Sequence, residues 1–175
     1  MGSFQIVLAT VFWVSLALVF YAYVGYPMLI WVLARLVGRA PRPPVVAEAD
    51  LPCVSLLIAA HNEEAVIEER IQNALAMDYP PEKLDIVVAS DGSTDGTAAI
   101  VKRYTDRGVR IFDYRQRRGK ASVLNAAFGE LKGDIVMLSD ANSFTDDSAA
   151  KSLVRCFSDP EVGIVCGKLV LTDPA

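Results

Sequence analysis

Apolar residues occupy the first 34 positions of the chain with almost no interruption, and the first charged residue is Arg35. A helix needs only about 20 such residues to cross a lipid bilayer. A cleaved signal peptide would carry a basic start and a shorter apolar core, and neither is present. The pattern predicts one transmembrane helix from Phe4 to Val37, kinked at Gly25-Tyr26-Pro27 because proline interrupts helical hydrogen bonding.

The end of this helix has the composition of a membrane interface. Four aromatic residues and three arginines gather there, namely Tyr21, Tyr23, Tyr26, Trp31, Arg35, Arg39 and Arg42. Basic residues that flank a span stay on the cytoplasmic side. We expect residues 1–38 to be the single N-terminal span of a cell-membrane protein, held in the lipid bilayer, with the remainder in the cytoplasm. Residues 39–52 are rich in proline and are predicted to be a semi-rigid linker.

The rest of the chain, residues 53–175, alternates apolar runs of strand length with segments of helical period. The predicted strands are 53–60, 84–90, 109–114, 134–139 and 162–171, and the predicted helices are 63–77, 95–107, 120–131 and 146–157. Strands that alternate with helices form parallel βαβ units, and continuously apolar strands are covered on both faces. The predicted fold class is therefore α/β, Rossmann-like, with a mostly parallel sheet.

Charge separates the two parts of the chain. All 21 acidic residues and 14 of the 17 basic residues follow position 42, so the part of the chain after position 42 carries a net charge of −7. A surface this acidic argues against nucleic acid as a partner. The cysteines, Cys53, Cys156 and Cys166, have no C-x-x-C spacing. We expect them to be reduced and buried rather than to bind a metal.

Polar residues follow three of the predicted strands where the apolar runs end. The stretches are AAHNE at 59–63, SDGSTDGT at 90–97 and SDAN at 139–142. Two of them place an aspartate, Asp91 or Asp140, directly after the apolar run. Ligands of open α/β sheets bind at the carboxyl ends of the strands. The sequence therefore predicts a site at this edge of the sheet.

Several enzyme classes are disfavoured by the same stretches. SDGSTDGT can be an ordinary turn and helix cap, and Ala89 stands where a D-x-D-G-T phosphatase needs its nucleophilic aspartate. His61 is the single histidine and no G-x-S-x-G motif accompanies it, which argues against hydrolysis. The chain has neither a G-x-G-x-x-G after the first strand nor a P-loop, so a dinucleotide dehydrogenase and a P-loop ATPase are disfavoured too.

Two further features suggest phosphate and metal chemistry. The run from Arg115 to Lys120 places four positive charges in six residues before a predicted helix. This position favours a segment that binds a diphosphate over a plain solvated loop. Asp140 and Asn142 alternate along an extended segment and point to the same side, as oxygen ligands of one Mg²⁺ or Mn²⁺ ion would. An Asx-turn that opens the next helix explains these two residues equally well. The residues alone do not separate the two interpretations.

Taken together, the stretches VSLLIAAHNEE, IVVASDGSTDGT, RRGKASVLNAA and DIVMLSDANS resemble the family 2 glycosyltransferases of the GT-A fold, in the membrane-bound, polysaccharide-synthase-like branch. The resemblance covers residues 52–172. The nucleotide-sugar-binding residues that it implies are Ala60, His61, Asn62, Glu63, Asp91, Lys120, Asn125 and Asp140.

The same resemblance implies a role for each of these residues. The loop 60–63 would line the uracil and ribose of a UDP-sugar, and Asp91 would accept a hydrogen bond from the base. Lys120 and Asn125 would face the diphosphate and the sugar. The remaining acid, Asp140, would belong to a D-x-D-like motif that holds the nucleotide and Mg²⁺ or Mn²⁺. The second candidate metal ligand is Asn142, where the family more often has aspartate.

The resemblance also implies the reaction. A base would deprotonate the hydroxyl of a glycan or lipid acceptor, which attacks the sugar with inversion while a divalent cation stabilises the leaving diphosphate. We expect the base beyond Ala175, so residues 53–175 would be the donor-binding N-terminal part of the domain, unable to turn over alone. The alternative is a non-catalytic, membrane-anchored nucleotide-binding module, which asparagine at position 142 favours.

Overall fold

The computed structural model describes residues 2–37, 46–168 and 170. The chain divides into two compact units, Met1–Arg42 and Pro43–Ala175. Half of the predicted linker, residues 39–45, lies outside the described residues. Its last part, 46–52, belongs to the second unit, where Leu51 is buried in the core.

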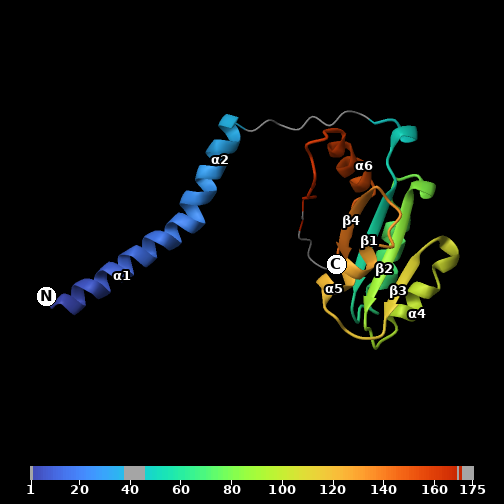
Figure 1. Cartoon of the computed structure of the whole chain (residues 1–175), viewed down its shortest axis with the longest axis horizontal. Helices are drawn as coiled ribbons and strands as arrows, with labels where there is room; N and C mark the ends of the chain where they lie inside the picture. Colours follow the sequence, from blue (N-terminus) through green and yellow to red (C-terminus); the bar gives the residue numbers. More distant parts are fainter. Residues whose placement is uncertain (1, 38–45, 169, 171–175) are drawn as a thin grey trace. The chain divides into compact units, whose positions relative to one another are not determined.

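The first unit is one apolar helix of 35 residues, Ser3–Val37. It consists of α1 (Ser3–Phe20), a π-helical turn (Tyr21–Gly25) and α2 (Tyr26–Val37). The π turn is closed by a hydrogen bond from the Tyr26 N–H to the Tyr21 carbonyl, five residues earlier. It ends at Gly25, where the predicted kink begins, and Figure 1 shows the helix bending there. Such bulges are an established cause of kinks. At about 1.5 Å per residue the helix is about 50 Å long, long and apolar enough to cross a membrane.

The second unit is built on a four-stranded parallel sheet with the strand order β3-β2-β1-β4. Its strands are β1 (Val54–Ala60), β2 (Leu84–Asp91), β3 (Arg110–Tyr114) and β4 (Ile135–Asp140). The chain adds β2 and β3 on one side of β1 and then crosses over to place β4 on the other side. The predicted α/β class with a parallel sheet is confirmed, and the strand order reverses beside β1.

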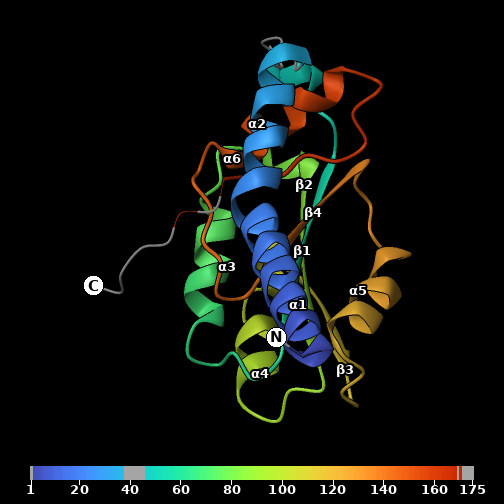
Figure 2. The same cartoon turned by 90° about the vertical axis from the view of Figure 1, so that its left-hand side faces the viewer.

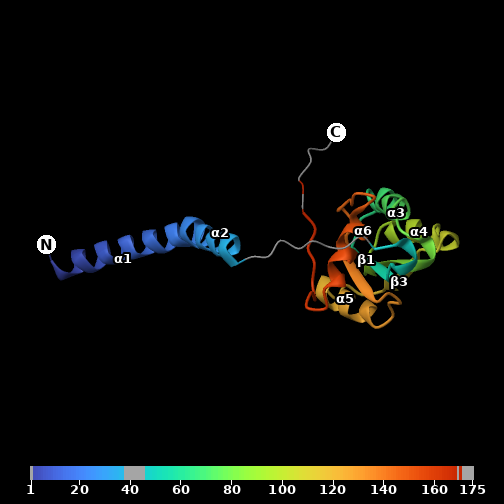
Figure 3. The ribbon, with the colours of Figure 1, turned by 90° about the horizontal axis from the view of Figure 1, so that it is seen from above.

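Helices cover both faces of the sheet. Figures 2 and 3 show α3 (Ile67–Leu75), α4 (Thr97–Lys102) and α6 (Ala149–Val154) on one face and α5 (Lys120–Phe128) on the other. Successive residues of a strand point to opposite faces. Leu56 and Ile58 therefore lie in the larger core beneath α3, α4 and α6, while Leu57 packs with Val123 beneath α5. Burying each such side chain stabilises the fold by about 1.5–3 kcal/mol.

The helix after β1 begins later than the hydrophobic period predicts, at Ile67 instead of Glu63. The intervening backbone is held by the loop that follows β2. The N–H of Glu63 donates to Thr97 Oγ1 (2.9 Å), and the N–H of Glu64 donates to Asp95 Oδ2 (3.1 Å). These long-range bonds join two loops at the carboxyl edge of the sheet.

Two expectations from the sequence are wrong. The predicted fifth strand, 162–171, forms no strand in its described residues. A strand needs a neighbour to satisfy its backbone groups, and in the described part of the chain the sheet ends at β4. The cysteines are not buried either, since Cys53 and Cys166 are exposed and Cys156 is partly exposed. All three lie outside the strands and α-helices that form the core.

Candidate functional site

A pocket of about 250 Å³ lies at the carboxyl ends of β1, β2 and β4, where the strand order reverses. It is lined by Ala59, Ala60, His61, Glu63, Asp91, Arg117, Gly119, Lys120, Val123, Asp140, Ala141 and Asn142. These residues come from four segments far apart in the sequence. The parallel register sets Ala59 beside Asp140. Open α/β sheets bind their ligands at this position.

The pocket brings together seven of the nine residues that the sequence singled out. They are Ala60, His61, Glu63, Asp91, Lys120, Asp140 and Asn142. Asn62 lies outside the lining, with a left-handed backbone (φ 55°) and a side-chain Oδ1 that accepts from the Thr94 N–H (2.9 Å). Asn125 is exposed on α5 and also lies outside the lining. Asn62 thus joins two loops, whereas Asn125 is not among the residues that line the pocket.

Asp91 holds the basic segment before α5 in place. Its two carboxylate oxygens accept hydrogen bonds from the N–H groups of Arg118 (2.6 Å) and Gly119 (2.8 Å). Asp91 is only 6% exposed. Gly119 has φ 86°, a backbone conformation that favours glycine. The geometry therefore gives Asp91 a loop-anchoring role that its position after a strand did not reveal.

The turn after β2 also fits tightly against this segment. Gly92 has φ 63°, and a Cβ atom at this position would lie 2.5 Å from the backbone nitrogen of Arg117. On the other side of the turn, His61 Nδ1 lies 2.7 Å from the Asp91 carbonyl oxygen. Because a carbonyl only accepts, Nδ1 carries the hydrogen and Nε2 is left for other contacts.

Two basic side chains line the pocket, Arg117 and Lys120. Lys120 forms an ion pair with Asp140. Both side chains are about half exposed, at 58% and 49%, so the pair adds little to stability. In the sequence, Arg117 is only one charge of the basic run from Arg115 to Lys120. Its place in the pocket lining depends on the loop that Asp91 anchors. The pocket thus combines a partly exposed carboxylate with two cations.

Asp140 and Asn142 suit a divalent cation in part. They lie in a turn closed by a hydrogen bond from the Ser143 N–H to the Asp140 carbonyl (3.2 Å). Carboxylate and amide oxygens are hard ligands of the kind that Mg²⁺ and Mn²⁺ prefer. Among the described residues, no group of three His, Cys, Asp or Glu side chains could hold a metal by itself. The donor set fits a cation that takes its other ligands from a diphosphate and water, as Mg²⁺ commonly does.

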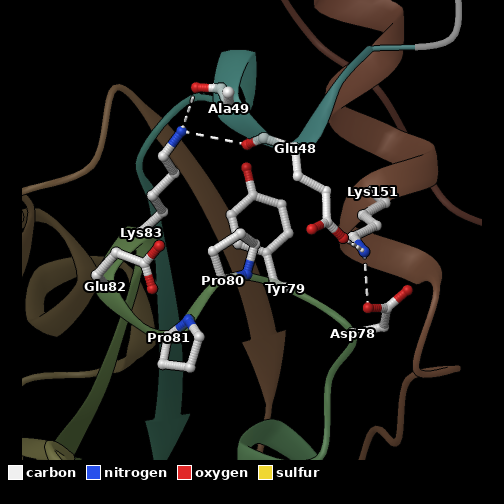
Figure 4. Close-up of a pocket in the computed structure, with 9 residues that line it drawn as sticks. All are labelled: Glu48, Ala49, Asp78, Tyr79, Pro80, Pro81, Glu82, Lys83 and Lys151. Atoms are coloured by element: carbon white, nitrogen blue, oxygen red, sulfur yellow. Dashed lines mark hydrogen bonds and ion pairs between the residues drawn. The ribbon is translucent and has the colours of Figure 1, made fainter.

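A second pocket, of about 430 Å³, lies near the amino ends of β1 and β2. Figure 4 shows Lys83 donating to the carbonyls of Glu48 and Ala49, while Lys151 bridges Glu48 and Asp78. These contacts fix the end of the predicted linker to the domain. The pocket is on the edge opposite to the strand-end aspartates, so it is not the candidate ligand site.

Comparison with known proteins relates the second unit to one enzyme family. Residues 55–174 match the family described as Glycosyl transferase family 2. The chain is 34% identical over 128 residues to the poly-beta-1,6-N-acetyl-D-glucosamine synthase of Staphylococcus aureus (strain COL), and 33% identical over 136 residues to the probable glycosyltransferase YdaM of Bacillus subtilis (strain 168). Each match covers 72% of this chain and 31% of the relative. The chain thus spans about a third of the length of these relatives.

Solved structures give the same relationship. The mannosyltransferase PcManGT from Pyrobaculum calidifontis, in complex with GDP-Man and Mn²⁺, superposes with a TM-score of 0.71 at 31% identity, covering 82% of this chain and 43% of that chain. TarS 1–349 from S. aureus, in complex with UDP-GlcNAc, has a TM-score of 0.54 at 24% identity, covering 57% and 29%. At that lower identity the likeness to TarS concerns the fold alone.

Proposed function

Because this chain belongs to glycosyl transferase family 2 and has the GT-A fold of a glycosyltransferase, we propose that its pocket binds a nucleotide-diphospho-sugar together with Mg²⁺ or Mn²⁺. A UDP-sugar is the first donor to test. The observation that carries the proposal is the convergence of Lys120, Arg117 and Asp140 at the switch point of the sheet. A diphosphate needs cationic partners, and the aspartate supplies a ligand for its counter-ion.

The ion pair between Lys120 and Asp140 explains how the pocket can accept both components. In the structure the Lys120 and Asp140 charges neutralise each other. A diphosphate would take over Lys120, which frees the Asp140 carboxylate for the cation. Because both side chains are about half exposed, exchanging these partners costs little free energy. Binding of the nucleotide and binding of the cation should therefore reinforce each other.

The other pocket residues fit the remaining parts of the donor. Ala60 and His61, at the end of β1, offer a small apolar surface and a ring for the base and ribose. Asp91 contributes by keeping Arg117 and Lys120 in place through its bonds to the loop. When bound, a divalent cation would neutralise charge that develops on the leaving diphosphate.

The whole reaction that we propose is transfer of the sugar to a glycan or lipid acceptor with inversion, by an enzyme held in the cell membrane through α1 and α2. The named activity of the S. aureus relative, synthesis of a polysaccharide, supports this substrate class. The helix Ser3–Val37, which is long and apolar enough to span a bilayer, supports the membrane anchor. The donor pocket is the part of this function that ligand binding tests directly.

Calorimetry of the full chain in detergent, titrated with UDP in the presence and absence of Mn²⁺, tests the proposal. We expect Mn²⁺ to tighten UDP binding. Asp140→Ala should abolish that gain, because losing even an outer partner of a metal ligand costs about 10- to 100-fold in metal affinity. Asp113→Ala is the matched control, since Asp113 is an exposed acid on β3 whose single ion pair within the described residues is with Lys102. UDP binding that is equally strong with a chelator, or equally strong in Asp140→Ala, would refute the metal role.

A further inference from the structure

Arg70 on α3 is a fully buried charge without an acidic partner in the part of the chain that the structure describes. It is 0% exposed, and its guanidinium donates to Asn73 Oδ1 (2.9 Å) and Ser139 Oγ (3.2 Å). Its Nε has no hydrogen-bond partner among the described residues. Burial lowers the pKa of Arg70 to about 10, so the side chain is still charged at neutral pH. An apolar side chain of similar volume would usually be at least as stable in such a place.

Asn73, one helical turn further on, holds a loop by its backbone. Its Oδ1 accepts from the Thr145 N–H (3.0 Å), and its Nδ2 donates to the Thr145 carbonyl (2.9 Å). Residues three apart on a helix are neighbours on one face, which is why Arg70 can also bond to Asn73. The two side chains form a single polar unit on the face of α3 that packs against the sheet.

The residues that this unit grips lie on either side of the candidate metal ligands. Ser139 is the last residue before Asp140, and Thr145 follows the turn that contains Asn142. The Ser139 hydroxyl that accepts from Arg70 lies 3.2 Å from the Asp140 carbonyl oxygen and donates to it. Both ends of the segment 139–145 are therefore attached to α3, while Asp140 and Asn142 between them remain at the pocket.

We propose that Arg70 and Asn73 are positioning residues that hold the turn of Asp140 and Asn142 in the geometry that the cation requires. This inference rests on the proposed function. A chelating pair contributes to affinity only if both oxygens are held at the correct distance and direction. Burying the Arg70 guanidinium costs free energy because the charge loses its hydration. Its hydrogen bond to the Ser139 hydroxyl holds the segment in place next to Asp140.

The test separates positioning from simple support of the fold. The full chain in detergent is saturated with UDP and titrated with MnCl₂, and free Mn²⁺ is followed by electron paramagnetic resonance. We expect Arg70→Met and Asn73→Leu to weaken Mn²⁺ binding by about 10- to 100-fold. UDP affinity with a chelator should stay unchanged, and Arg70→Met should have a Tm equal to or above that of the wild type. The matched control is Gln72→Ala, which removes an amide on the same helix that bonds instead to Tyr104 (3.2 Å).

Hydrogen exchange gives a second measurement without any ligand. The Thr145 amide should exchange faster in Asn73→Leu than in the wild type and Gln72→Ala, because its acceptor is lost. If an α3 variant does not fold, Ser139→Ala removes the acceptor of the Arg70 hydrogen bond without changing α3. This variant must also weaken Mn²⁺ binding. Mn²⁺ affinity that stays at the wild-type value in folded variants would overturn the positioning role. A wild-type chain that binds neither UDP nor Mn²⁺ would instead reject the proposed function and this role with it.

Discussion

Asp91 and Gly92, the last residue of β2 and the one after it, act on the same basic segment in different ways. Asp91 attracts the segment through two backbone N–H groups. Gly92 allows it to approach, because any side chain there would meet the backbone of Arg117. The sequence shows both residues as an ordinary turn motif. Their importance for the pocket becomes visible only when the partner segment, about 25 residues away in the chain, is in place.

Gly92→Ala should therefore damage the site more than its stability cost suggests. A left-handed backbone costs a non-glycine residue about 1–2 kcal/mol, and the clash with Arg117 must additionally displace the loop. We expect lower stability in urea unfolding and clearly weaker UDP binding by calorimetry. Gly108→Ala is the matched control, since Gly108 also has a positive φ (87°) but nothing within 4 Å of the added Cβ. Equal loss of UDP affinity in both variants would contradict this explanation.

The strands are joined at the amino edge of the sheet by a second polar network. Asp85 on β2 accepts two hydrogen bonds from Arg110 on β3 (2.8 and 2.7 Å) and one from Ser55 on β1 (2.9 Å). Partial burial alone would raise the pKa of Asp85, but the hydrogen bonds from Arg110 and Ser55 outweigh it and lower the pKa below its usual 3.8. The ionised form is thus favoured by folding.

This network predicts a specific loss of stability in acid. Because the folded-state pKa of Asp85 is depressed, its contribution is fully present above the ordinary pKa of 3.8 and is lost as the pH falls through the lower folded value. We expect Asp85→Asn to reduce the free energy of unfolding at pH 7 by about 1–3 kcal/mol, and the difference from wild type to shrink once the pH falls below 3.8. Urea unfolding followed by circular dichroism between pH 7 and pH 3 measures it. An unchanged difference at pH 3 would be the contrary result, and Asp113→Asn, at an exposed acid, is the control.

At the scale of elements, the sequence predicted the four strands of the sheet well and the fifth wrongly. The continuous apolar runs of β1 and β4 have the length of a strand and are local features of the sequence, so the pattern alone identifies them. An apolar run such as 162–168 indicates a tendency to be buried. It does not show whether a neighbouring strand is present to pair with it. The helix after β1 begins at Ile67, later than the pattern predicts. The backbone before it donates from Glu63 and Glu64 to Thr97 and Asp95, contacts between distant residues that the sequence pattern does not contain.

For the whole molecule, the proposed arrangement is a single span with the enzyme domain in the cytoplasm. The exposed thiols of Cys53 and Cys166 allow a direct measurement with a membrane-impermeant maleimide. We expect labelling of these cysteines in lysed spheroplasts and none in intact ones. A variant with serine at all three cysteines and Ser3→Cys should be labelled in intact spheroplasts, since residue 3 is the N-terminal end of the span. Labelling of Cys53 without lysis would show the opposite orientation.

The sequence by itself determined the apolar helix, the parallel α/β class and the polar strand ends that contain Asp91 and Asp140. Each of these follows from local periodicity and from residue types that neighbour one another in the chain. Only the tertiary structure decided that β4 lies beside β1, which brings Asp140 to Lys120. It also decided that Arg70 is buried and donates a hydrogen bond to Ser139, the residue before Asp140. These contacts join residues that are far apart in the chain and are stabilised by burial and hydrogen bonding in the folded state. The local pattern of apolar and polar residues does not specify which distant segments pair.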